Sequence, residues 1–447
     1  MRALPMVMTS ETFQLFTVPW ARSEMQVGIP QKMLQGKIEF TDLPALPDPA
    51  VAFRQAMDEP IGTPPLAEIV RPGAKVALLT GDRMTDLMLG SRDGLGHVIL
   101  DYLNRAGVRD EDVTLVFAPG THPIRNADEK LGPKLIGRVG RYVKHDALDD
   151  RALRFVGYTS HGNAIWLNRA VVEADVVIGV GEISPNTHGG WCGGGKMIVP
   201  GVAGRATVEH NHRQLIRADT PLGLADGNPL RRDMEEGADL GRLAFKLDVL
   251  VNSDQRIVGV FSGDFRKEHR AALPTAREIW MTRLEPVDIA VFSPGDQREY
   301  YLESSLFLSL DAALLATRPD GVIIFLASAR GGYAPEGGGL SFNYRTTARE
   351  VLTWSSPEIA RAMIDAEGNV RTGSILFAAK RVLEQRAVFL VSEGIDPAEA
   401  RAFGFADGFG TFEEALARAR ALKGSAASLA TCFPRGIQWR ILPWREG

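Results

Sequence analysis

Short apolar runs alternate with helical stretches along much of the chain, and this alternation constrains the fold more than any other feature. Residues 75–80, 113–117 and 173–179 each have the composition of a buried strand. Helical stretches at about 94–105 and 127–139 lie between them. Strands that alternate with helices predict a parallel sheet covered by helices. In such sheets, ligands bind beyond the carboxyl ends of the strands.

The alternation begins again near residue 286, after a predicted helix at about 274–281. We therefore predict an α/β fold of two lobes with mostly parallel, helix-covered sheets, divided into residues 1–284 and residues 285–447. Residues 1–70 are rich in proline and are expected to be an irregular lead-in with a few short elements. The second lobe is expected to hold strands at 287–292, 321–326 and 387–391 and helices at 303–317, 357–365, 374–386 and about 411–422.

Composition narrows the class of protein. The 447 residues include 51 Lys and Arg against 55 Asp and Glu, a net charge of −4, so no global charge attracts nucleic acid or an anionic membrane. The two cysteines, Cys192 and Cys432, exclude a disulfide scaffold and a metal site of four cysteines. We find no signal-peptide pattern in the first 25 residues and no apolar run long enough to span a membrane. A cytoplasmic enzyme is the expectation.

The most informative segment is residues 189–201, GGWCGGGKMIVPG. Gly190 to Lys196 have the spacing of a phosphate-binding loop, but Met197 stands where such a loop needs Ser or Thr to hold magnesium. A glycine-rich turn with a solvated lysine is the plain alternative. Against it, consecutive glycines let the backbone approach a bulky planar group, and a lysine beside them can hold a ligand or become covalently linked to it.

Two histidines follow this segment, His210 and His212. Side chains two residues apart on a helix point in different directions, so only one of the pair is expected to face a site.

Several short motifs follow one another in a particular order along the chain. They are residues 58–66, Gly120-Thr121-His122, Gly181-x-Ile183-x-Pro185, Gly193-Gly194-Gly195-Lys196-x-Ile198-x-Pro200-Gly201-Val202-Ala203-Gly204, and Asn211-His212. In this combination the sequence resembles the lactate racemase family, the 2-hydroxyacid racemases and epimerases that use a nickel-pincer nucleotide. The resemblance is densest over residues 58–212 and continues weakly to about residue 330.

The resemblance implies a cofactor, a nickel pyridinium-3,5-bisthiocarboxylic acid mononucleotide in which a ring carbon and two sulfurs bind the nickel. Lys196 occupies the place of the lysine that bonds covalently to it. His212 matches the histidine that supplies the remaining nickel ligand, and imidazole suits nickel. The other implied cofactor-binding residues are Gly193, Gly194, Gly195 and Thr121.

The reaction implied by the resemblance inverts C2 of a 2-hydroxy acid. His122 takes the hydroxyl proton while the C2 hydride moves to the cofactor, and the resulting 2-keto acid takes the hydride back on its other face. Arg83 lies where the family has an arginine near the substrate carboxylate, with Thr80 beside it. Residues 1–284 would then hold the cofactor, and residues 285–447 would close over the substrate, with the site in the cleft between the domains and the last segment able to pack back on the first.

The sequence departs from the family at the second catalytic histidine, where it has Asn186. An amide cannot take a proton, so His188 is the candidate for that role, with a structural role as its alternative; Asn186 is left as a substrate-binding residue. The family's substrate-binding Gln and Lys align roughly with Ser305 and Leu308. These changes favour a substrate other than lactate, such as a sugar acid or an aryl-substituted 2-hydroxy acid.

Two other functions remain open. Asn186 allows a divergent family member that binds the same cofactor and catalyses another hydride-transfer step. A non-catalytic protein that binds an organic acid is the alternative from a different class, and the combination of His122, Lys196 and His212 speaks against it. Neither nucleic acid nor a membrane is expected as a partner.

Overall fold

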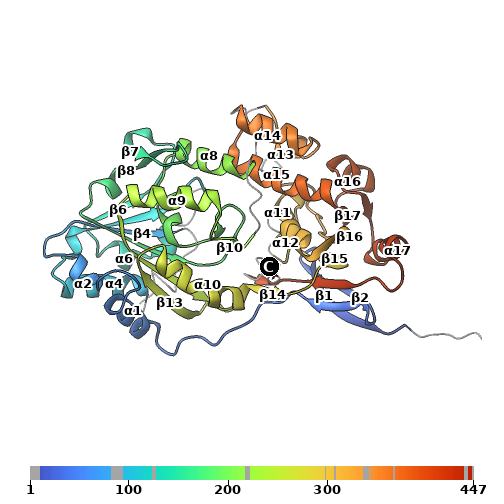
Figure 1. Cartoon of the computed structure of the whole chain (residues 1–447), viewed down its shortest axis with the longest axis horizontal. Helices are drawn as coiled ribbons and strands as arrows, with labels where there is room; N and C mark the ends of the chain where they lie inside the picture. Colours follow the sequence, from blue (N-terminus) through green and yellow to red (C-terminus); the bar gives the residue numbers. More distant parts are fainter. Residues whose placement is uncertain are drawn as a thin grey trace, which may run out of the picture. The chain divides into compact units, whose positions relative to one another are not determined.

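A computed structural model gives the arrangement of the chain. It describes residues 11–81, 94–122, 127–216, 222–296, 298–306, 309–335, 342–343, 345–365, 368–436 and 441–444. Its internal contacts divide the chain into two compact units (Figure 1). We call Thr41–Trp280 the 41–280 unit, and Met281–Gly447 together with Met1–Phe40 the 281–447 unit.

The 41–280 unit is built on a six-stranded sheet in the order β13-β12-β9-β4-β5-β6. All neighbours in it are parallel except β13, which runs antiparallel to β12. The three strands expected from the sequence are β4, β5 and β9, so the prediction of a parallel sheet is confirmed. The strands are β4 (Val76–Gly81), β5 (Val113–Ala118), β6 (Arg141–Lys144), β9 (Val176–Glu182), β12 (Leu243–Val251) and β13 (Ile257–Gly263).

One buried cluster joins this sheet to the helices that carry the site. Leu79 of β4, Val116 of β5 and Val177 of β9 belong to the same cluster as Val208 of α8 and Met234 of α9. These two helices therefore pack on one face of the sheet. The helices of the unit are α1 (Pro49–Asp58), α2 (Leu66–Ile69), α4 (Leu95–Arg105), α5 (Ala127–Leu131), α6 (Pro133–Ile136), α7 (Arg169–Val172), α8 (Arg205–Arg213), α9 (Pro229–Leu240) and α10 (Lys267–Trp280).

Two helices differ from the sequence-based expectation. The single helix expected at 127–139 is interrupted, because Gly132 adopts a φ of +73° and Pro133 begins a new helix, α6. Helix α10 begins at Lys267, before the predicted start, and continues through Pro274. Two small antiparallel pairs complete the unit, β7 (Leu153–Tyr158) with β8 (Ala164–Asn168) and β10 (Pro185–Asn186) with β11 (Gly190–Trp191).

The 281–447 unit holds a second six-stranded sheet, in the order β18-β17-β16-β15-β19-β3, and every pair in it is parallel. The helix expected at 303–317 is present as two shorter helices, α11 and α12. The strands are β3 (Leu34–Lys37), β15 (Val287–Phe292), β16 (Thr317–Leu326), β17 (Ala387–Val391), β18 (Asp407–Phe409) and β19 (Leu429–Cys432), with β14 (Met281–Arg283) paired to β20 (Leu442–Trp444). The helices are α11 (Leu302–Ser305), α12 (Ser309–Ala316), α13 (Ala348–Val351), α14 (Ser356–Ile364), α15 (Val370–Gln385), α16 (Pro397–Phe403) and α17 (Phe412–Lys423).

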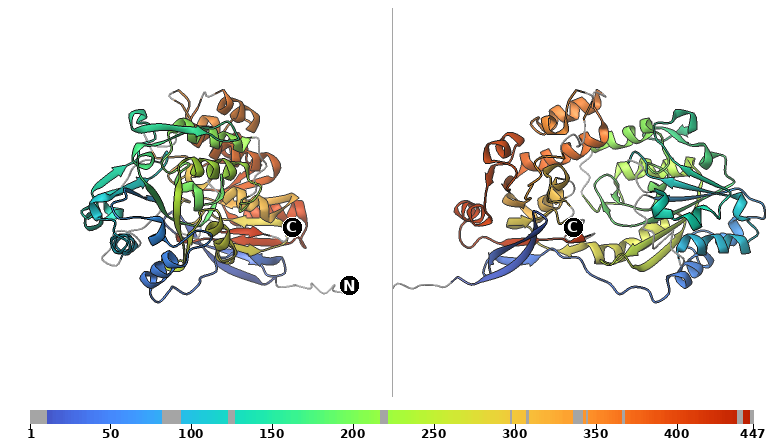
Figure 2. Two further views of the ribbon diagram at one scale, coloured as in Figure 1. Left: turned by 60° about the vertical axis from the view of Figure 1, so that its left-hand side comes forward. Right: turned by 180° about the vertical axis from the view of Figure 1, so that it is seen from behind.

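The beginning of the chain is more regular than expected and packs elsewhere than expected. β1 (Phe13–Trp20) and β2 (Ser23–Pro30) form an antiparallel hairpin rather than an irregular lead-in. Its inward side chains share a buried cluster with Ile289 and Ile324 of the second sheet, which β3 extends. Residues 1–40 therefore belong with residues 281–447, whereas the sequence grouped them with 41–284. Figure 2 shows the blue hairpin beside the red strands in both views. Among the described residues, no helix is long and apolar enough to cross a membrane.

Candidate functional site

The segments that carry the predicted site residues follow β5 and β9. After β5, the chain turns at Gly120, Thr121 and His122, and the amide of Gly120 donates to the carbonyl of Gly201 at 2.9 Å. Gly120 has a φ of +62°, and a Cβ there would lie 3.1 Å from the carbonyl oxygen of Pro200. Only glycine fits such a position comfortably. The turn with His122 is thereby held against the segment that follows Lys196.

Asn186 is the hydrogen-bond centre of the loop after β9. Its Oδ1 accepts from the Nζ of Lys196 at 2.9 Å and from the backbone amides of His188 and Gly189 at 3.1 and 3.0 Å. Its side chain is nearly buried. One amide oxygen thus closes the turn that carries His188 and also orients the amine of Lys196. The Oδ1 of Asn186, a residue expected to bind substrate, is therefore engaged in hydrogen bonds within the loop.

His188 and His212 stack on each other. Their ring centroids lie 4.0 Å apart with 27° between the planes, and the residues are only 7% and 8% exposed. His212 comes from α8, a separate element from the loop of His188. Contacts therefore join four of the predicted residues into one cluster. We call Asn186, His188, Lys196 and His212 the amine–imidazole cluster.

The two histidines of α8 differ as their spacing predicts. His212 is buried in the cluster, whereas His210 is half-buried and its Nε2 lies 3.2 Å from the carbonyl oxygen of His161. His210 therefore serves the neighbouring loop, and His212 is the one that reaches the amine–imidazole cluster.

The glycines before Lys196 have a different explanation from the one expected. A Cβ on Gly193 would lie 2.6 Å from Oδ2 of Asp248, and one on Gly195 would lie 3.2 Å from the Cβ of Ala238 in α9. A side chain at Gly193 would collide with Asp248, and one at Gly195 would require the neighbouring atoms of α9 to shift, because the loop packs tightly on α9 and β12. The close approach of a flat ligand is not needed to explain these glycines.

Buried charges support the loop from below, and the sequence analysis missed them. The amide of Gly194 donates to Asp248 at 2.6 Å, and Asp248 forms an ion pair with Lys246, both on β12 and both fully buried. Burial, followed by the charge of Asp248, raises the pKa of Glu268 on α10 well above its ordinary value. A lysine and an aspartate inside the otherwise apolar run of β12 were the signal that could have identified this support.

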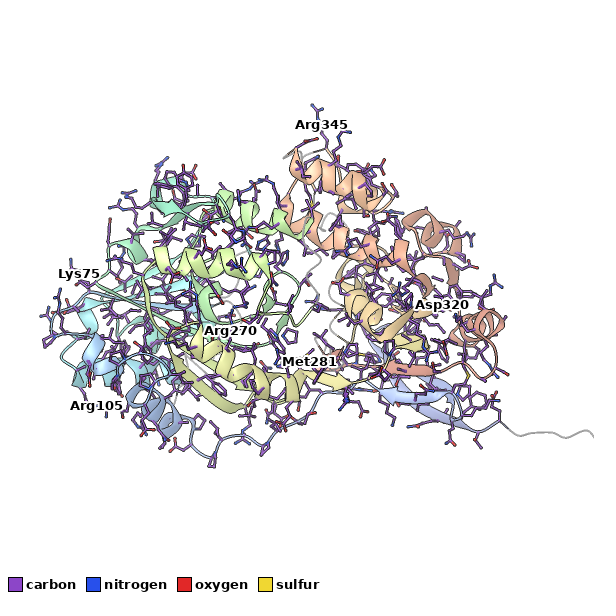
Figure 3. The ribbon with its side chains drawn as sticks, viewed as in Figure 1. Lys75, Arg105, Arg270, Met281, Asp320 and Arg345 are labelled. Carbon is purple, nitrogen blue, oxygen red and sulfur yellow. The ribbon has the colours of Figure 1, made fainter. Side chains whose placement is uncertain are left out.

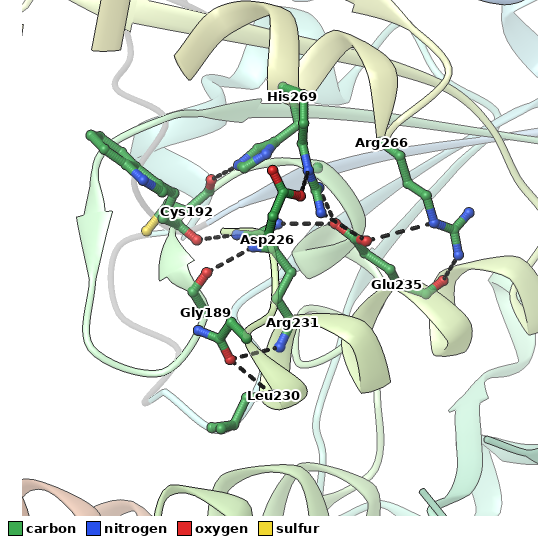
Figure 4. Close-up of polar contacts among 12 residues, drawn as sticks. Gly189, Cys192, Asp226, Leu230, Arg231, Glu235, Arg266 and His269 are labelled. Atoms are coloured by element: carbon green, nitrogen blue, oxygen red, sulfur yellow. Dashed lines mark hydrogen bonds and ion pairs between the residues drawn. The ribbon is translucent and has the colours of Figure 1, made fainter. Parts of the chain in front are cut away.

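Arg231 of α9 holds the other side of the loop (Figure 4). Its Nε donates to the carbonyl of Gly189 at 2.7 Å, and its terminal nitrogen donates to the carbonyl of Trp191. Burial lowers the pKa of Arg231. The Nε2 of His269 lies 2.9 Å from the carbonyl oxygen of Cys192, and burial, followed by the charge of Arg231, lowers the pKa of His269 well below its ordinary value.

A carboxylate completes this support. Glu235 of α9 pairs with Arg231 at 3.6 Å and also pairs with Arg270 of α10, whose place Figure 3 labels. Arg270 in turn contacts Asp226 at 3.0 Å. The network lies among α9, α10 and the loop, so it fixes the loop's backbone by charge as well as by packing.

The other predicted residues have mixed outcomes. Thr80, near the end of β4, is fully buried, and its hydroxyl has no hydrogen-bond partner among the described residues. Thr121 and His122 are half-buried. Ser305 donates to the carbonyls of Arg298 and Tyr301, so its hydroxyl serves the backbone around α11. Arg83 and Leu308 lie outside the described residues.

Comparisons with known proteins identify relatives of the chain. Residues 20–221 match the family model of the lactate racemase N-terminal domain. The chain is 27% identical over 337 residues to a lactate racemase from Thermoanaerobacterium thermosaccharolyticum, covering 72% of this chain and 76% of that protein. It is 26% identical over 394 residues to a lactate racemase from Lactiplantibacillus plantarum, covering 86% of this chain and 88% of that protein.

Two solved structures share the fold. The lactate racemase apoprotein from Thermoanaerobacterium thermosaccharolyticum superposes with a TM-score of 0.80 at 22% identity, covering 96% of this chain and 100% of that one. A protein from Thermotoga maritima superposes with a TM-score of 0.59 at 16% identity, covering 91% of this chain and 100% of that one. At these sequence identities, the structural similarity establishes the fold alone.

Proposed function

The chain is a divergent member of the lactate racemase family, and from that premise we propose that it is a racemase or epimerase acting at C2 of a 2-hydroxy acid. The proposed cofactor is the nickel-pincer nucleotide, with Lys196 as its covalent attachment and His212 as the protein's nickel ligand. Family membership supports the reaction class, and the contacts of this chain's own residues support the assignments.

The observation that carries the proposal is the amine–imidazole cluster. Asn186 links Lys196 to the turn of His188, and the ring of His188 lies on that of His212. The donors fit a metal whose other ligands arrive with a bound group, because one imidazole alone leaves most of a nickel coordination sphere open. In the described residues, no group of three or more His, Cys, Asp or Glu side chains lies close enough to hold a metal. When bound, the cofactor supplies the hydride acceptor that no amino-acid side chain offers.

The loop would position the cofactor through rigid backbone. Asp248 and Arg231 hold Gly194, Gly189 and Trp191 by hydrogen bonds to their backbone groups. A site on a backbone fixed in this way keeps its geometry when a ligand binds. We propose that the backbone of Gly193, Gly194 and Gly195, together with Thr121, lies against the nucleotide.

His122 is the proposed acid–base group for the substrate hydroxyl. A neutral imidazole can accept the hydroxyl proton and return it, since its ordinary pKa lies near neutrality. The hydrogen bond from Gly120 to Gly201 ties the turn of His122 to the segment after Lys196. We propose that Arg83 and the buried hydroxyl of Thr80 bind the substrate carboxylate.

His188 is the proposed second acid–base group. Asn186 cannot exchange a proton, and its oxygen already accepts three hydrogen bonds within the loop. His188 is the other ionisable side chain of the amine–imidazole cluster besides Lys196 and His212. The changes at Asn186, Ser305 and Leu308 support a 2-hydroxy acid other than lactate, such as a sugar acid or an aryl-substituted acid.

A second function is favoured by Asn186. Without a histidine there, the chain could bind the same cofactor and oxidise the 2-hydroxy acid to a 2-keto acid, with an external two-electron acceptor taking the hydride from the cofactor in each turnover. The two functions differ in product: inversion returns the hydride to C2 and accumulates no keto acid, whereas net oxidation accumulates it.

The test uses the full chain produced together with the enzymes that make the cofactor. Intact-mass measurement is expected to show a nucleotide adduct that maps to Lys196 and that is missing from Lys196→Ala produced in parallel. A set of sugar and aryl 2-hydroxy acids is then assayed for inversion at C2 by chiral separation and for keto acid by absorbance. Absence of the adduct from the wild-type chain overturns the proposal; an adduct with keto acid as the sole product favours the second function.

A further inference from the structure

A chain of hydrogen bonds leads from the ring of His212 into the protein. The Nδ1 of His212 lies 3.1 Å from the Oδ1 of Asn211, its neighbour on α8. The Nδ2 of Asn211 donates to the carbonyl of Leu230 at 2.9 Å and to Oδ2 of Asp233 at 2.7 Å, both on α9. Asn211 and Asp233 are fully buried. The chain therefore joins the proposed nickel ligand to a carboxylate that solvent does not reach.

These partners determine which way the amide of Asn211 points. A backbone carbonyl and a carboxylate oxygen only accept hydrogen bonds, so the group that faces Leu230 and Asp233 must be the NH₂. The amide oxygen is then left to face His212. Because that oxygen only accepts, the Nδ1 of His212 must carry the proton and donate it.

Asp233 is held firmly enough to enforce this orientation. Its Oδ1 accepts from the hydroxyl of Thr159 at 2.6 Å, and its Oδ2 accepts from the Nδ2 of Asn163 at 2.9 Å as well as from Asn211. Three donors from two segments of the chain, the 159–163 turn and α8, converge on this carboxylate. A flipped Asn211 would place its oxygen against the oxygens of Asp233 and Leu230, which is unfavourable in a buried site.

We propose that Asn211 and Asp233 are positioning residues that hold the ring of His212 with Nδ1 protonated, so that Nε2 carries the lone pair that binds the metal. The inference rests on the proposed function for the identity of the metal and its cofactor, but the proton's position on the ring is a property of this chain. A hydrogen bond to the far nitrogen of a metal-binding histidine sets its tautomer and its ring orientation.

The chain supplies a matched control in Asn163. Its Nδ2 also donates to Oδ2 of Asp233 and to one backbone carbonyl, that of Thr207 at 3.1 Å. Asn163→Ala and Asn211→Ala therefore remove the same two kinds of hydrogen bond. Only Asn211→Ala removes the contact with the ring of His212.

The first measurement needs no cofactor. In the full chain with ¹⁵N-labelled histidine, at about pH 8 and so above the ordinary histidine pKa of about 6.5, long-range ¹H–¹⁵N correlation spectra report which ring nitrogen is protonated. The signals of His212 are those missing from His212→Gln. We expect Nδ1 to be protonated in the wild-type chain and in Asn163→Ala. In Asn211→Ala we expect a mixture of the two tautomers. A His212 protonated at Nε2 in the wild-type chain overturns the inference even if Asn211→Ala fails to fold.

The second measurement is the nickel content of the cofactor-loaded chain under increasing chelator. Loss of a hydrogen bond of this kind typically weakens metal binding by about 10- to 100-fold, so we expect that loss in Asn211→Ala relative to Asn163→Ala. Equal nickel retention in the two variants overturns the inference. If the wild-type chain shows the expected tautomer but takes up no adduct at Lys196, the proposed function fails and the assignment of the proton stands.

Discussion

The two units build sheets of the same size and nearly the same parallel arrangement, yet they use the carboxyl ends of their strands differently. In the 281–447 unit, polar groups after the strands bind one another. Ser328, after β16, donates to Glu299, and Ser392, after β17, donates to the carbonyl of Ser328 at 2.9 Å. Glu299 also accepts from the backbone amides of Ala21 and Arg22 at the tip of the N-terminal hairpin. These hydrogen bonds connect the loops after β16 and β17 to each other and to the N-terminal hairpin, so the polar groups there have a structural role.

In the 41–280 unit, the loop after β9 and helix α8 instead bring together an amine and two imidazoles. Support for that loop comes from Asp248 and Arg231, which hydrogen-bond to its backbone. The difference teaches that a parallel sheet provides the location for a site, whereas the loop residues decide whether chemistry takes place there.

The largest expected difference between the units concerns two lysines. Lys196→Met removes the proposed attachment, so the adduct and the activity should both be lost, with little change in stability. Lys380→Met, in α15, should do the opposite, because the buried Nζ of Lys380 donates to the carbonyls of Leu352 and Phe403 at 3.1 and 2.9 Å. Unsatisfied buried carbonyls cost about 1–3 kcal/mol each. Intact mass, turnover and thermal unfolding of both variants check the pair; an adduct on Lys196→Met would contradict it.

His122 provides the next test of chemistry against structure. His122→Gln removes the proposed acid–base group, and kcat should fall by about 10²- to 10⁴-fold, the usual contribution of such a group. His210→Gln is the control, since His210 contacts a backbone carbonyl outside the amine–imidazole cluster. Turnover in the cofactor-loaded proteins is the measurement. Equal activity of the two variants would remove His122 from the mechanism.

Asn186 and Ser328 occupy comparable places after strands of the two sheets. Asn186→Ala leaves Lys196 and the turn of His188 without their shared acceptor, so adduct formation and turnover should slow by about 10- to 100-fold, as misplaced reacting groups do. Ser328→Ala removes a buried hydrogen bond to Glu299 and should cost about 1–3 kcal/mol of stability with turnover unchanged. Adduct formation over time and chemical denaturation separate the two effects; normal adduct formation in Asn186→Ala would show that Lys196 needs no such partner.

The smallest expected effect is a pH dependence of stability in the 41–280 unit. Burial lowers the pKa of His269 in the folded chain, so below the ordinary value of about 6.5 the unfolded chain takes up a proton that the folded chain does not. His269 therefore destabilises the fold as pH falls below that value, and the effect is absent above it. His269→Gln keeps a donor for the carbonyl of Cys192 and should lose less stability between pH about 7.5 and 5.5. Burial also lowers the pKa of His145, so part of the pH dependence of stability should remain in His269→Gln. Identical melting-temperature profiles for variant and wild type would contradict the assignment.

The strands were predictable and the N-terminal hairpin was not, for one physical reason. β4, β5 and β9 are short apolar runs, so their composition identifies them without any knowledge of their neighbours. The hairpin turns at Ala21 and Arg22, whose φ angles of 51° and 65° are normally adopted by Gly, Asn or Asp. The sequence therefore carries no turn signal at these residues. Tertiary contacts, such as the hydrogen bonds from the amides of Ala21 and Arg22 to Glu299, hold the turn instead.

The site residues also fall into those that the sequence identifies and those that only the structure identifies. Lys196, His122 and His212 stand in recognisable local patterns, so the sequence could identify them. Asn186 could be identified only as a departure from the pattern, and its role as acceptor for Lys196 appears in the contacts. Asp233 belongs to no pattern, and Asp248 stands out only as a charge inside the apolar run of β12. The role of each is recognisable only when α9 and β12 lie beside the loop.

The sequence by itself determined the α/β class, the short strands and the residue types able to hold a metal-bearing cofactor, because these follow from local composition and spacing. The tertiary structure decided that residues 1–40 join residues 281–447, that His188 lies on His212, that Asn186 holds Lys196, and that the glycines of the loop are required by the protein beneath them. Each of these depends on packing between segments distant along the chain, and such packing leaves no local signal in the sequence.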